Sequence, residues 1–309
     1  METLTRASNP LTSLSIDQRE FAPLLEEFKD GIVAIDLETT GLSPLTDRII
    51  ELAAVKISPQ GFEVWDTLVD PQISIPPNTT DIHGITDDMV AGKPLIESAL
   101  KEYLAFVGDL PIVAHNAKFD IGFIVFSQHQ HKIPLAKNPV YCSVKASRKA
   151  FADMENHKLG HLCEKLEISL DNHHRATDDA FACLSLFNKC LQTPYKDRAL
   201  KEASLFKVSD FKRNTFTDIP DKLKLLQKKA ERQTVVDIKY KGGSHKGKFR
   251  PIKPISLLPM PEGNILYGLC LLSNIHKSFA LSKIQDVKEL NAEEISQRFK
   301  ELEKQLKKS

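Results

Sequence analysis

The sequence contains no run of apolar residues approaching the roughly 20 that are needed to span a bilayer. Its polar start, METLTRASNPLTS, lacks the apolar core of a secretory signal. Cysteine is scarce: the five cysteines are an odd number, include no C-x-x-C pair and lie mostly in apolar runs. These absences argue against disulfides and a zinc site, and they predict a cytoplasmic protein without membrane contact.

The chain also lacks a strong excess of either charge, since its formal net charge is +1. Its length of 309 residues nevertheless exceeds the usual size of one core, so two folded units are expected. From residue 191 onward there are about 25 Lys and Arg against about 14 Asp and Glu, and the preceding part is acidic. Such runs often serve only solubility, but an acidic part beside a basic part suits a nucleic-acid enzyme.

Hydrophobic patterning predicts an α/β domain over residues 29–191, after a tail and a short helix over residues 1–28. Strands are expected at 31–38, 48–58 and 62–70, with a Pro-Gln-Gly hairpin signal between the last two. Helices and short strands then alternate: helix 96–107, strand 111–116, helix 117–131, strand 140–144, and helices 144–151, 158–166 and 176–191. This order indicates layered α/β architecture with a mixed sheet.

The second part of the chain has a different pattern. Residues 192–230 are interpreted as a basic linker and a helix, because no clear periodicity appears between 192 and 218. Four short strands separated by Gly, Pro and Asn turns predict a small β domain over 231–290. Residues 291–309 open with Asn and acids and close with lysines, as a C-terminal helix does.

Two acids, Asp36 and Glu38, lie at the carboxyl end of the first apolar strand. Their spacing of two places both side chains on one face of a strand. Buried like charges repel and lose hydration unless a cation neutralises them, so the pair indicates a metal site. The alternative is that the strand ends at Ile35 and that both acids are solvated loop residues.

Further along the chain, Asp120 follows the strand PIVAHN, and Asn116 is expected to cap the next helix. Phe123 and Ile124, three and four residues later, are apolar, which predicts that Asp120 faces inward. An ordinary first-turn acid that complements the helix dipole is the alternative.

In the segment HRATDDA, helical geometry selects between two neighbouring aspartates. Asp179 shares a stripe with the apolar residues of its helix, whereas Asp178 shares the side of Lys189. Asp179 is therefore predicted to point inward. His174 lies in the loop just before the helix, close to whatever Asp179 binds.

These motifs resemble those of a known family. DLETTG, HNAKFD and HRATDDA are similar, in order and spacing, to the three exonuclease motifs of the DEDDh, or DnaQ-like, superfamily, and IHGIT and HNAKFDIGF look like the epsilon proofreading subunit of bacterial DNA polymerase III. The resemblance implies an RNase H-like fold and a 3′→5′ exonuclease, favouring DNA, that releases nucleoside 5′-monophosphates. It implies two Mg²⁺ or Mn²⁺ ions and the following ligands: Asp36, Glu38, Asp120 and Asp179. His174 would be the general base, since imidazole titrates near neutral pH.

The same resemblance implies a set of substrate-binding residues that match the family position by position. They are Thr39, Gly41, Leu42, Ile82, His83, His115, Asn116 and Phe119. Ordinary core packing is an equal alternative for Leu42 and Phe119, and a structural role is an alternative for His115 and Asn116.

The strands over 231–290 resemble the WYL domain of bacterial regulators, a small Sm-like or SH3-like β-barrel. Tyr267 stands where the family has tyrosine, but Leu266 and Gly268 replace the neighbouring Trp and Leu. The implied contacts to an oligonucleotide or nucleotide phosphate are Arg250, Lys253, Tyr267, Lys277 and Lys283. The alternative is a basic barrel without a specific ligand.

Three functions compete at this point. An exonuclease acting in DNA replication or repair is favoured, because no catalytic acid is replaced. An exoribonuclease trimming RNA 3′ ends is the close rival, since the motifs do not read the 2′-OH. A nucleotide-sensing regulator is less favoured, because no helix-turn-helix pattern precedes the barrel. Association with a polymerase and the oligomeric state stay open.

Overall fold

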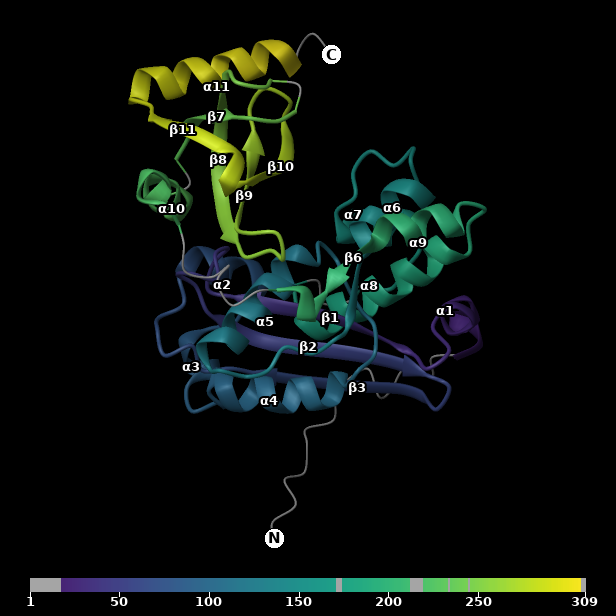
Figure 1. Cartoon of the computed structure of the whole chain (residues 1–309). Coiled ribbons are helices and arrows are strands. Elements are labelled where there is room, and N and C mark those ends of the chain that lie inside the picture. Colours follow the sequence, from purple (N-terminus) through teal and green to yellow (C-terminus); the bar gives the residue numbers. More distant parts are fainter. Residues whose placement is uncertain (1–17, 171–173, 212–218, 233, 244, 307–309) are drawn as a thin grey trace.

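The computed structural model describes residues 18–170, 174–211, 219–232, 234–243 and 245–306 (Figure 1). The tail predicted for residues 1–17 lies outside these ranges. Residues 18–211 form what we call the nuclease lobe, and residues 219–306 form the C-terminal lobe. Each lobe is built on its own β-sheet, with six strands in the nuclease lobe and five in the C-terminal lobe.

The sheet of the nuclease lobe has the strand order β3-β2-β1-β4-β5-β6. Strands β1, β2 and β3 form an antiparallel meander, β4 and β5 run parallel to β1, and β6 is antiparallel to β5. The sheet is mixed, as predicted. The strand bounds are β1 Ile32–Thr39, β2 Ile49–Ser58, β3 Gly61–Leu68, β4 Ile112–Ala114, β5 Pro139–Cys142 and β6 Ser204–Lys207.

Helices cover both faces of this sheet because β1 is apolar on both sides. Val33 and Ile35 belong to one buried cluster, whereas Ile32 and Ala34 belong to the other, as the strand period of two requires. The first cluster includes residues of α4 and α5, and the second includes residues of α1, α6, α7, α8 and α9. The helix bounds are α1 Ala22–Glu27, α2 Pro77–His83, α3 Asp87–Val90, α4 Ile96–Val107, α5 Lys118–Gln130, α6 Ser143–Ala150, α7 Leu159–Lys165, α8 Ala176–Leu191 and α9 Lys196–Ala203.

The stretch after residue 191 departs from the expected linker. It contains α9, which packs on α6, and β6, which extends the sheet beyond β5. The periodicity of α9 is faint because its buried positions are the small residues Ala199 and Ala203. Strand β6 has only four residues, so neither element is conspicuous in the sequence.

The C-terminal lobe is a five-stranded antiparallel sheet with the order β10-β9-β8-β7-β11. Within the described ranges no ladder joins the outer strands β10 and β11, and closure into a WYL-type barrel stays a prediction. Strand β11 was not expected, because most of its residues are exposed. The bounds are η5 Asp221–Leu223, α10 Lys224–Glu231, β7 Val236–Tyr240, β8 Phe249–Leu258, β9 Ile265–Cys270, β10 Ile275–Ala280, η6 Leu281–Lys283, β11 Ile284–Glu289 and α11 Ala292–Leu306.

The two lobes meet where the β8–β9 hairpin contacts α5. Leu258, Met260 and Ile265 are buried in the same cluster as Phe123 of α5. A Cβ atom added to Gly122 would lie 3.2 Å from Leu258 Cδ2, so a small residue lets the hairpin approach the helix closely. Apolar packing therefore fixes the C-terminal sheet above the start of α5 (Figure 1).

Among the helices described, none has both the length and the hydropathy that crossing a membrane requires.

Candidate active site

Asp36 and Glu38 lie inside β1, which continues to Thr39. The loop alternative is therefore wrong. Both side chains are half-buried and alternate with the buried Leu37, so they share one face of the strand. Asp36 pairs with Ala53 of β2, and Glu38 pairs with Glu51.

Asp120 lies in the first turn of α5 and is only 2% exposed. Its Oδ2 atom has no hydrogen-bond partner among the described residues. The predicted cap by Asn116 is wrong, because the helix begins at Lys118 and the preceding Ala117 occupies the N-cap position. Asn116 instead has a left-handed backbone with φ of 69°, and its carbonyl accepts the N–H of Phe119.

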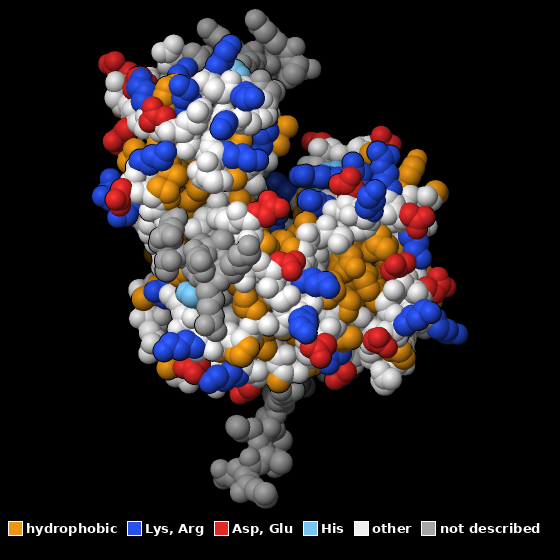
Figure 2. All heavy atoms as spheres, in the orientation of Figure 1, with side chains coloured by type: hydrophobic (Ala, Val, Ile, Leu, Met, Phe, Trp, Pro, Cys, Tyr) orange, Lys and Arg blue, Asp and Glu red, His pale blue; other side chains and the backbone are white. Residues whose placement is uncertain are grey.

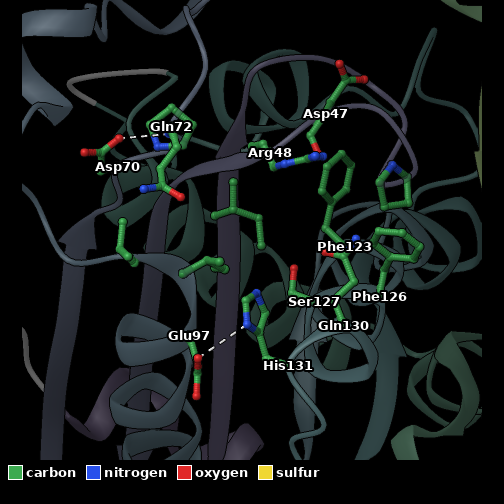
Figure 3. Close-up of a pocket in the computed structure, with 15 residues that line it drawn as sticks. Asp47, Arg48, Asp70, Gln72, Glu97, Phe123, Phe126, Ser127, Gln130 and His131 are labelled. Atoms are coloured by element: carbon green, nitrogen blue, oxygen red, sulfur yellow. Dashed lines mark hydrogen bonds and ion pairs between the residues drawn. The ribbon is translucent and has the colours of Figure 1, made fainter.

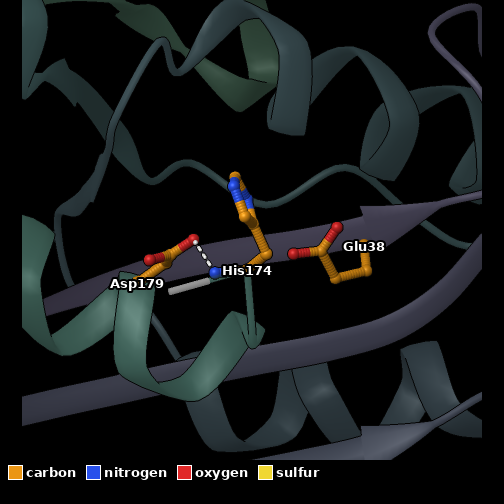
Figure 4. A group of neighbouring side chains, drawn as sticks. All are labelled: Glu38, His174 and Asp179. Carbon is orange, nitrogen blue, oxygen red and sulfur yellow. Dashed lines mark hydrogen bonds between the residues drawn. The ribbon is translucent and has the colours of Figure 1, made fainter. Parts of the chain in front are cut away.

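Asp179, in the first turn of α8, is 6% exposed, whereas Asp178 is only half-buried. The inward position of Asp179 is confirmed. His174 lies in the turn before α8 with a φ of 71°, and its backbone N–H donates to Asp179 Oδ2 at 3.2 Å. Ligand atoms of Glu38, His174 and Asp179 all lie within 4.8 Å of one another (Figure 4).

We call the four predicted metal ligands, Asp36, Glu38, Asp120 and Asp179, the acid group. Their mutual repulsion is unfavourable without a cation. Burial raises the pKa of Asp36 well above its ordinary value, and the neighbouring Asp120, Asp179 and Glu38 raise it further. Burial also raises the pKa of Glu38 to about 9 and that of Asp120 to about 8. Four crowded carboxylates and a free Asp120 oxygen fit a divalent ion that prefers oxygen ligands.

An ion pair between the buried Glu51 and the exposed Arg175, which the sequence analysis missed, supports the turn at His174. Glu51 is 2% exposed, and it accepts hydrogen bonds from Arg175 Nη2 at 2.7 Å and from the backbone N–H of Ala176 at 3.1 Å. Arg175 Nε also donates to the same carboxylate at 3.2 Å. The pair therefore fastens the start of α8 to β2, directly beside Glu38. An acid inside the apolar stretch IIELAAV was the available signal.

Among the predicted substrate-binding residues, Leu42 and Ile82 present large apolar side chains to solvent. They are 40% and 56% exposed, so core packing is excluded for Leu42. His83 is buried, its Nδ1 accepts the N–H of Ile85 at 3.0 Å, and its Nε2 has no partner among the described residues. Burial lowers the pKa of His83, with His174 adding to this effect and Glu51 opposing it, so this ring lies near the acid group.

Three other predicted residues have identifiable local roles. Thr39 Oγ1 donates to the carbonyl of Gly41. A Cβ atom at Gly41 would come within 2.5 Å of the Asp47 carboxylate, so a side chain here would displace this carboxylate from the N–H of Ser43. Phe119 is half-buried and its ring packs on Phe123 at a centroid distance of 5.0 Å, which agrees with the core-packing alternative.

His115 uses both ring nitrogens within the protein. Nδ1 lies 2.9 Å from Ser143 Oγ, and Nε2 lies 3.1 Å from the carbonyl oxygen of His157. His115 thus connects the end of β4 to α6 and to the segment before α7.

The predicted contacts of the C-terminal lobe do not share one face. Strand register places Lys253 and Tyr267 on the outer face of the sheet and Arg250 and Lys277 on its core face. Arg250 is 4% exposed and its guanidinium lies 5.5 Å from the Phe279 ring. Lys283 is exposed in η6.

A separate pocket of about 250 Å³ opens between α4, α5 and the loop before β2 (Figure 3). Arg48, Gln72, Phe123 and His131 are among its lining residues, and His131 pairs with Glu97 at 3.6 Å. None of the four predicted metal ligands lines this pocket, so it is distinct from the acid group.

The layered mixed sheet and the two half-buried acids on its central strand define a nuclease of the RNase H-like class. The chain belongs to the RNase_T exonuclease family, whose pattern matches residues 33–187. It is similar to DNA polymerase III PolC-type of Clostridium perfringens, with 43% identity over 158 residues that cover 51% of this chain and 11% of the relative. The protein of the same name from Bacillus subtilis is 39% identical over 173 residues, covering 55% of this chain and 12% of the relative.

The matched part thus spans only about a tenth of these relatives, and it lies in the nuclease lobe. Among solved structures, one titled "The structure of exonuclease I suggests how processivity is achieved" resembles this chain with a TM-score of 0.50 and 16% identity. It covers 90% of this chain and 70% of the other, and at this identity the likeness concerns the fold alone. The sequence resemblance to the DnaQ-like superfamily is therefore supported, with PolC-type proteins among the relatives.

Proposed function

We propose that this protein is a metal-dependent exonuclease that removes nucleotides from the 3′ end of DNA and releases nucleoside 5′-monophosphates. The observation that carries the proposal is the convergence of Glu38, Asp179 and His174 within 4.8 Å, beside the half-buried Asp36 and the buried Asp120. Such crowding of acids lowers the stability of the fold, and the binding of catalytic metal ions explains why the acids are gathered here.

In this proposal the four carboxylates, Asp36, Glu38, Asp120 and Asp179, hold two ions of the Mg²⁺ or Mn²⁺ class. When bound, such ions supply positive charge to the attacking water, the phosphate and the leaving 3′ oxygen. His174 accepts the proton of the water through its imidazole. Its backbone N–H to Asp179 and the neighbouring Glu51–Arg175 pair hold the turn that carries it.

The terminal nucleotide would lie against Leu42 and Ile82, whose exposed apolar side chains offer surfaces for a base. The unpartnered Nε2 of His83 is available for a hydrogen bond to it. Removal from the 3′ end follows the DEDDh resemblance. The choice of DNA rests on the relatives, which are named as DNA polymerases. Association with a polymerase has the same support and no other.

For the rest of the chain we propose that the nuclease domain continues through α9 and β6, because both pack on its sheet. The C-terminal lobe would then begin with η5 and α10 and would act as a basic accessory domain of the WYL type.

A direct assay tests the proposal. Single-stranded DNA, duplex DNA and RNA of the same sequence are labelled at the 5′ end and incubated with Mg²⁺ or with EDTA. We expect DNA to shorten stepwise from its 3′ end in Mg²⁺ and to stay intact in EDTA, with 5′-mononucleotides as products. Faster loss of RNA would assign the enzyme to RNA, and cleavage in EDTA would contradict the metal site.

A further inference from the structure

A hollow separates the outer face of the C-terminal sheet from α6 and α7, and Lys and Arg side chains gather on its walls (Figure 2). We propose that this hollow binds single-stranded nucleic acid and leads its 3′ end to the buried acids. The proposal rests on the nuclease function above and deepens it by naming the form of the substrate.

One wall belongs to the nuclease lobe and carries four cations. They are Lys118 at the start of α5, Lys145 and Arg148 of α6, and Lys158 just before α7. Within the described ranges none of the four forms an ion pair. Cations without an acidic partner attract a polyanion such as a phosphate backbone.

The opposite wall is a pair of stacked rings on the C-terminal sheet. Tyr267 of β9 and His276 of β10 have a centroid distance of 5.7 Å and an interplanar angle of 19°. Strand register places both rings, together with Lys253, on the outer face. His276 is exposed and Tyr267 is half-buried, so the stack offers a flat surface to a base.

The two walls face each other across the hollow. Burial raises the pKa of Tyr267 whereas Arg148 lowers it, so this ring and this guanidinium are near enough to interact. Burial lowers the pKa of His276, and Lys158 adds to that effect. A cation of the nuclease lobe thus acts electrostatically on each ring of the stack.

The nuclease wall also adjoins the acids. Ser143, the first residue of α6, accepts a hydrogen bond from Cys183 Sγ at 3.4 Å. Burial raises the pKa of Cys183, and Asp36 and Asp120 raise it further. The start of α6 therefore lies near Asp36 and Asp120.

Single-stranded nucleic acid fits this surface better than a duplex does. A strand exposes both its phosphates and its base faces, which match the cations and the stacked rings. A duplex hides its base faces in the stack and would contact only the cations.

Two double variants of the full-length protein test the inference. Arg148→Ser with Lys158→Ser removes two cations from exposed positions, and Tyr267→Leu with His276→Leu removes the flat rings but keeps apolar volume. The matched control is Lys29→Ser with Lys93→Ser, two exposed lysines of the nuclease lobe on other elements. Fluorescence anisotropy gives the affinity for a 30-nucleotide oligo-dT at several salt concentrations, and turnover of a dinucleotide reports on the acids alone.

We expect the cation variant to bind the 30-mer about 10-fold more weakly and its salt slope to fall by about 1.4, since each lost contact on a single strand contributes about 0.7. The ring variant should also bind about 10-fold more weakly with its slope unchanged, because stacking is not electrostatic. Dinucleotide turnover and the control variant should match the wild type. Unchanged affinities in both variants, or equal losses for a blunt duplex, would overturn the inference. If the wild type cleaves nothing, the nuclease proposal fails, while the binding data still decide the hollow.

Discussion

The two lobes bury aspartates in opposite ways. In the C-terminal lobe Asp237 is 2% exposed, and its Oδ2 pairs with Arg298 Nη2 of α11 at 2.8 Å. In the nuclease lobe Asp120 and Asp179 are equally hidden, yet the groups around them include further carboxylates, which raise the pKa of Asp36. A buried acid with a cation supports its fold, whereas buried acids that face one another oppose it. The acids that repel one another in the nuclease lobe therefore indicate a catalytic site there, whereas the paired Asp237 indicates a structural role.

The largest expected effect comes from exchanging one buried aspartate in each lobe. Asp179→Asn should lower nuclease turnover about 10³-fold or more, because a lost metal ligand removes several kcal/mol of transition-state stabilisation. It should also raise the melting temperature of the metal-free protein, since one repelling charge is gone. Asp237→Asn should keep turnover and lower stability by about 1–3 kcal/mol, because Arg298 loses a charged partner.

Turnover of single-stranded DNA and melting in EDTA measure both variants. Circular dichroism provides the check that each variant is folded. If Asp179→Asn lost stability and Asp237→Asn gained it, the contrast between the lobes would be reversed and the metal site would lose its main support.

His174→Ala is expected to lower turnover about 10²- to 10⁴-fold, the usual worth of a general base. Because the four carboxylates stay in place, Mg²⁺ should still raise the melting temperature of this variant as it does in the wild type. A His174→Ala enzyme of normal rate would assign proton removal to another group. Loss of the Mg²⁺ effect would make His174 a ligand, which its distance to Glu38 and Asp179 permits.

The acids of the nuclease lobe could be predicted because they break local rules. Asp36 and Glu38 interrupt an apolar strand, and Asp179 interrupts the apolar stripe of a helix. Their apolar neighbours therefore indicate that these acids point inward. The main strands and helices of this lobe could be predicted because their apolar residues recur with a regular period over many positions. Helix α4, Ile96–Val107, has the predicted bounds.

What escaped prediction depends on contacts between distant segments. The Glu51–Arg175 pair joins residues 124 positions apart, and no local pattern connects them. Strand β6 takes its place in the sheet by pairing with β5, and β11 does so by pairing with β7. The hollow between the lobes depends on the packing of Leu258 against α5. The sequence pattern of either lobe alone does not predict this contact.

The Glu51–Arg175 pair gives a test of intermediate size. Glu51→Gln should lower turnover about 10- to 100-fold, as loss of support around a metal site commonly does, while KM for a dinucleotide stays near the wild-type value. The cause is a loosened turn at His174, because the amide cannot accept all three hydrogen bonds. Glu97→Gln, which weakens the pairs of Glu97 with Lys101 and His131 away from the predicted metal ligands, is the matched control and should leave turnover unchanged. A change confined to KM would exclude a role in positioning.

The raised pKa values predict how pH changes the stability of the metal-free protein. The pKa of Glu38 is about 9 and that of Asp120 about 8 in the folded state, above the ordinary carboxyl range. At a pH between the ordinary carboxyl pKa of the unfolded state and these raised values, the folded state binds more protons than the unfolded state. The free energy of unfolding therefore falls as pH rises from about 5 to about 9. Mg²⁺ should therefore raise the melting temperature more at pH 8 than at pH 6. An equal rise at both values would indicate that the ion binds away from these acids.

The smallest effect is expected at Asp178, the immediate neighbour of Asp179. Its side chain is half-buried. The charge of Asp178 contributes to the raised pKa of Arg175, but it is the weakest of the contributions that raise it. Asp178→Ala should change turnover by less than about twofold, in line with surface substitutions that alter stability by about 0.5 kcal/mol or less. Side-by-side kinetics of Asp178→Ala and Asp179→Ala measure the contrast at one residue of separation. Since consecutive helical residues point about 100° apart, only one of the two can face Glu38. An inactive Asp178→Ala beside a normal Asp179→Ala would show that α8 presents its other side to the substrate.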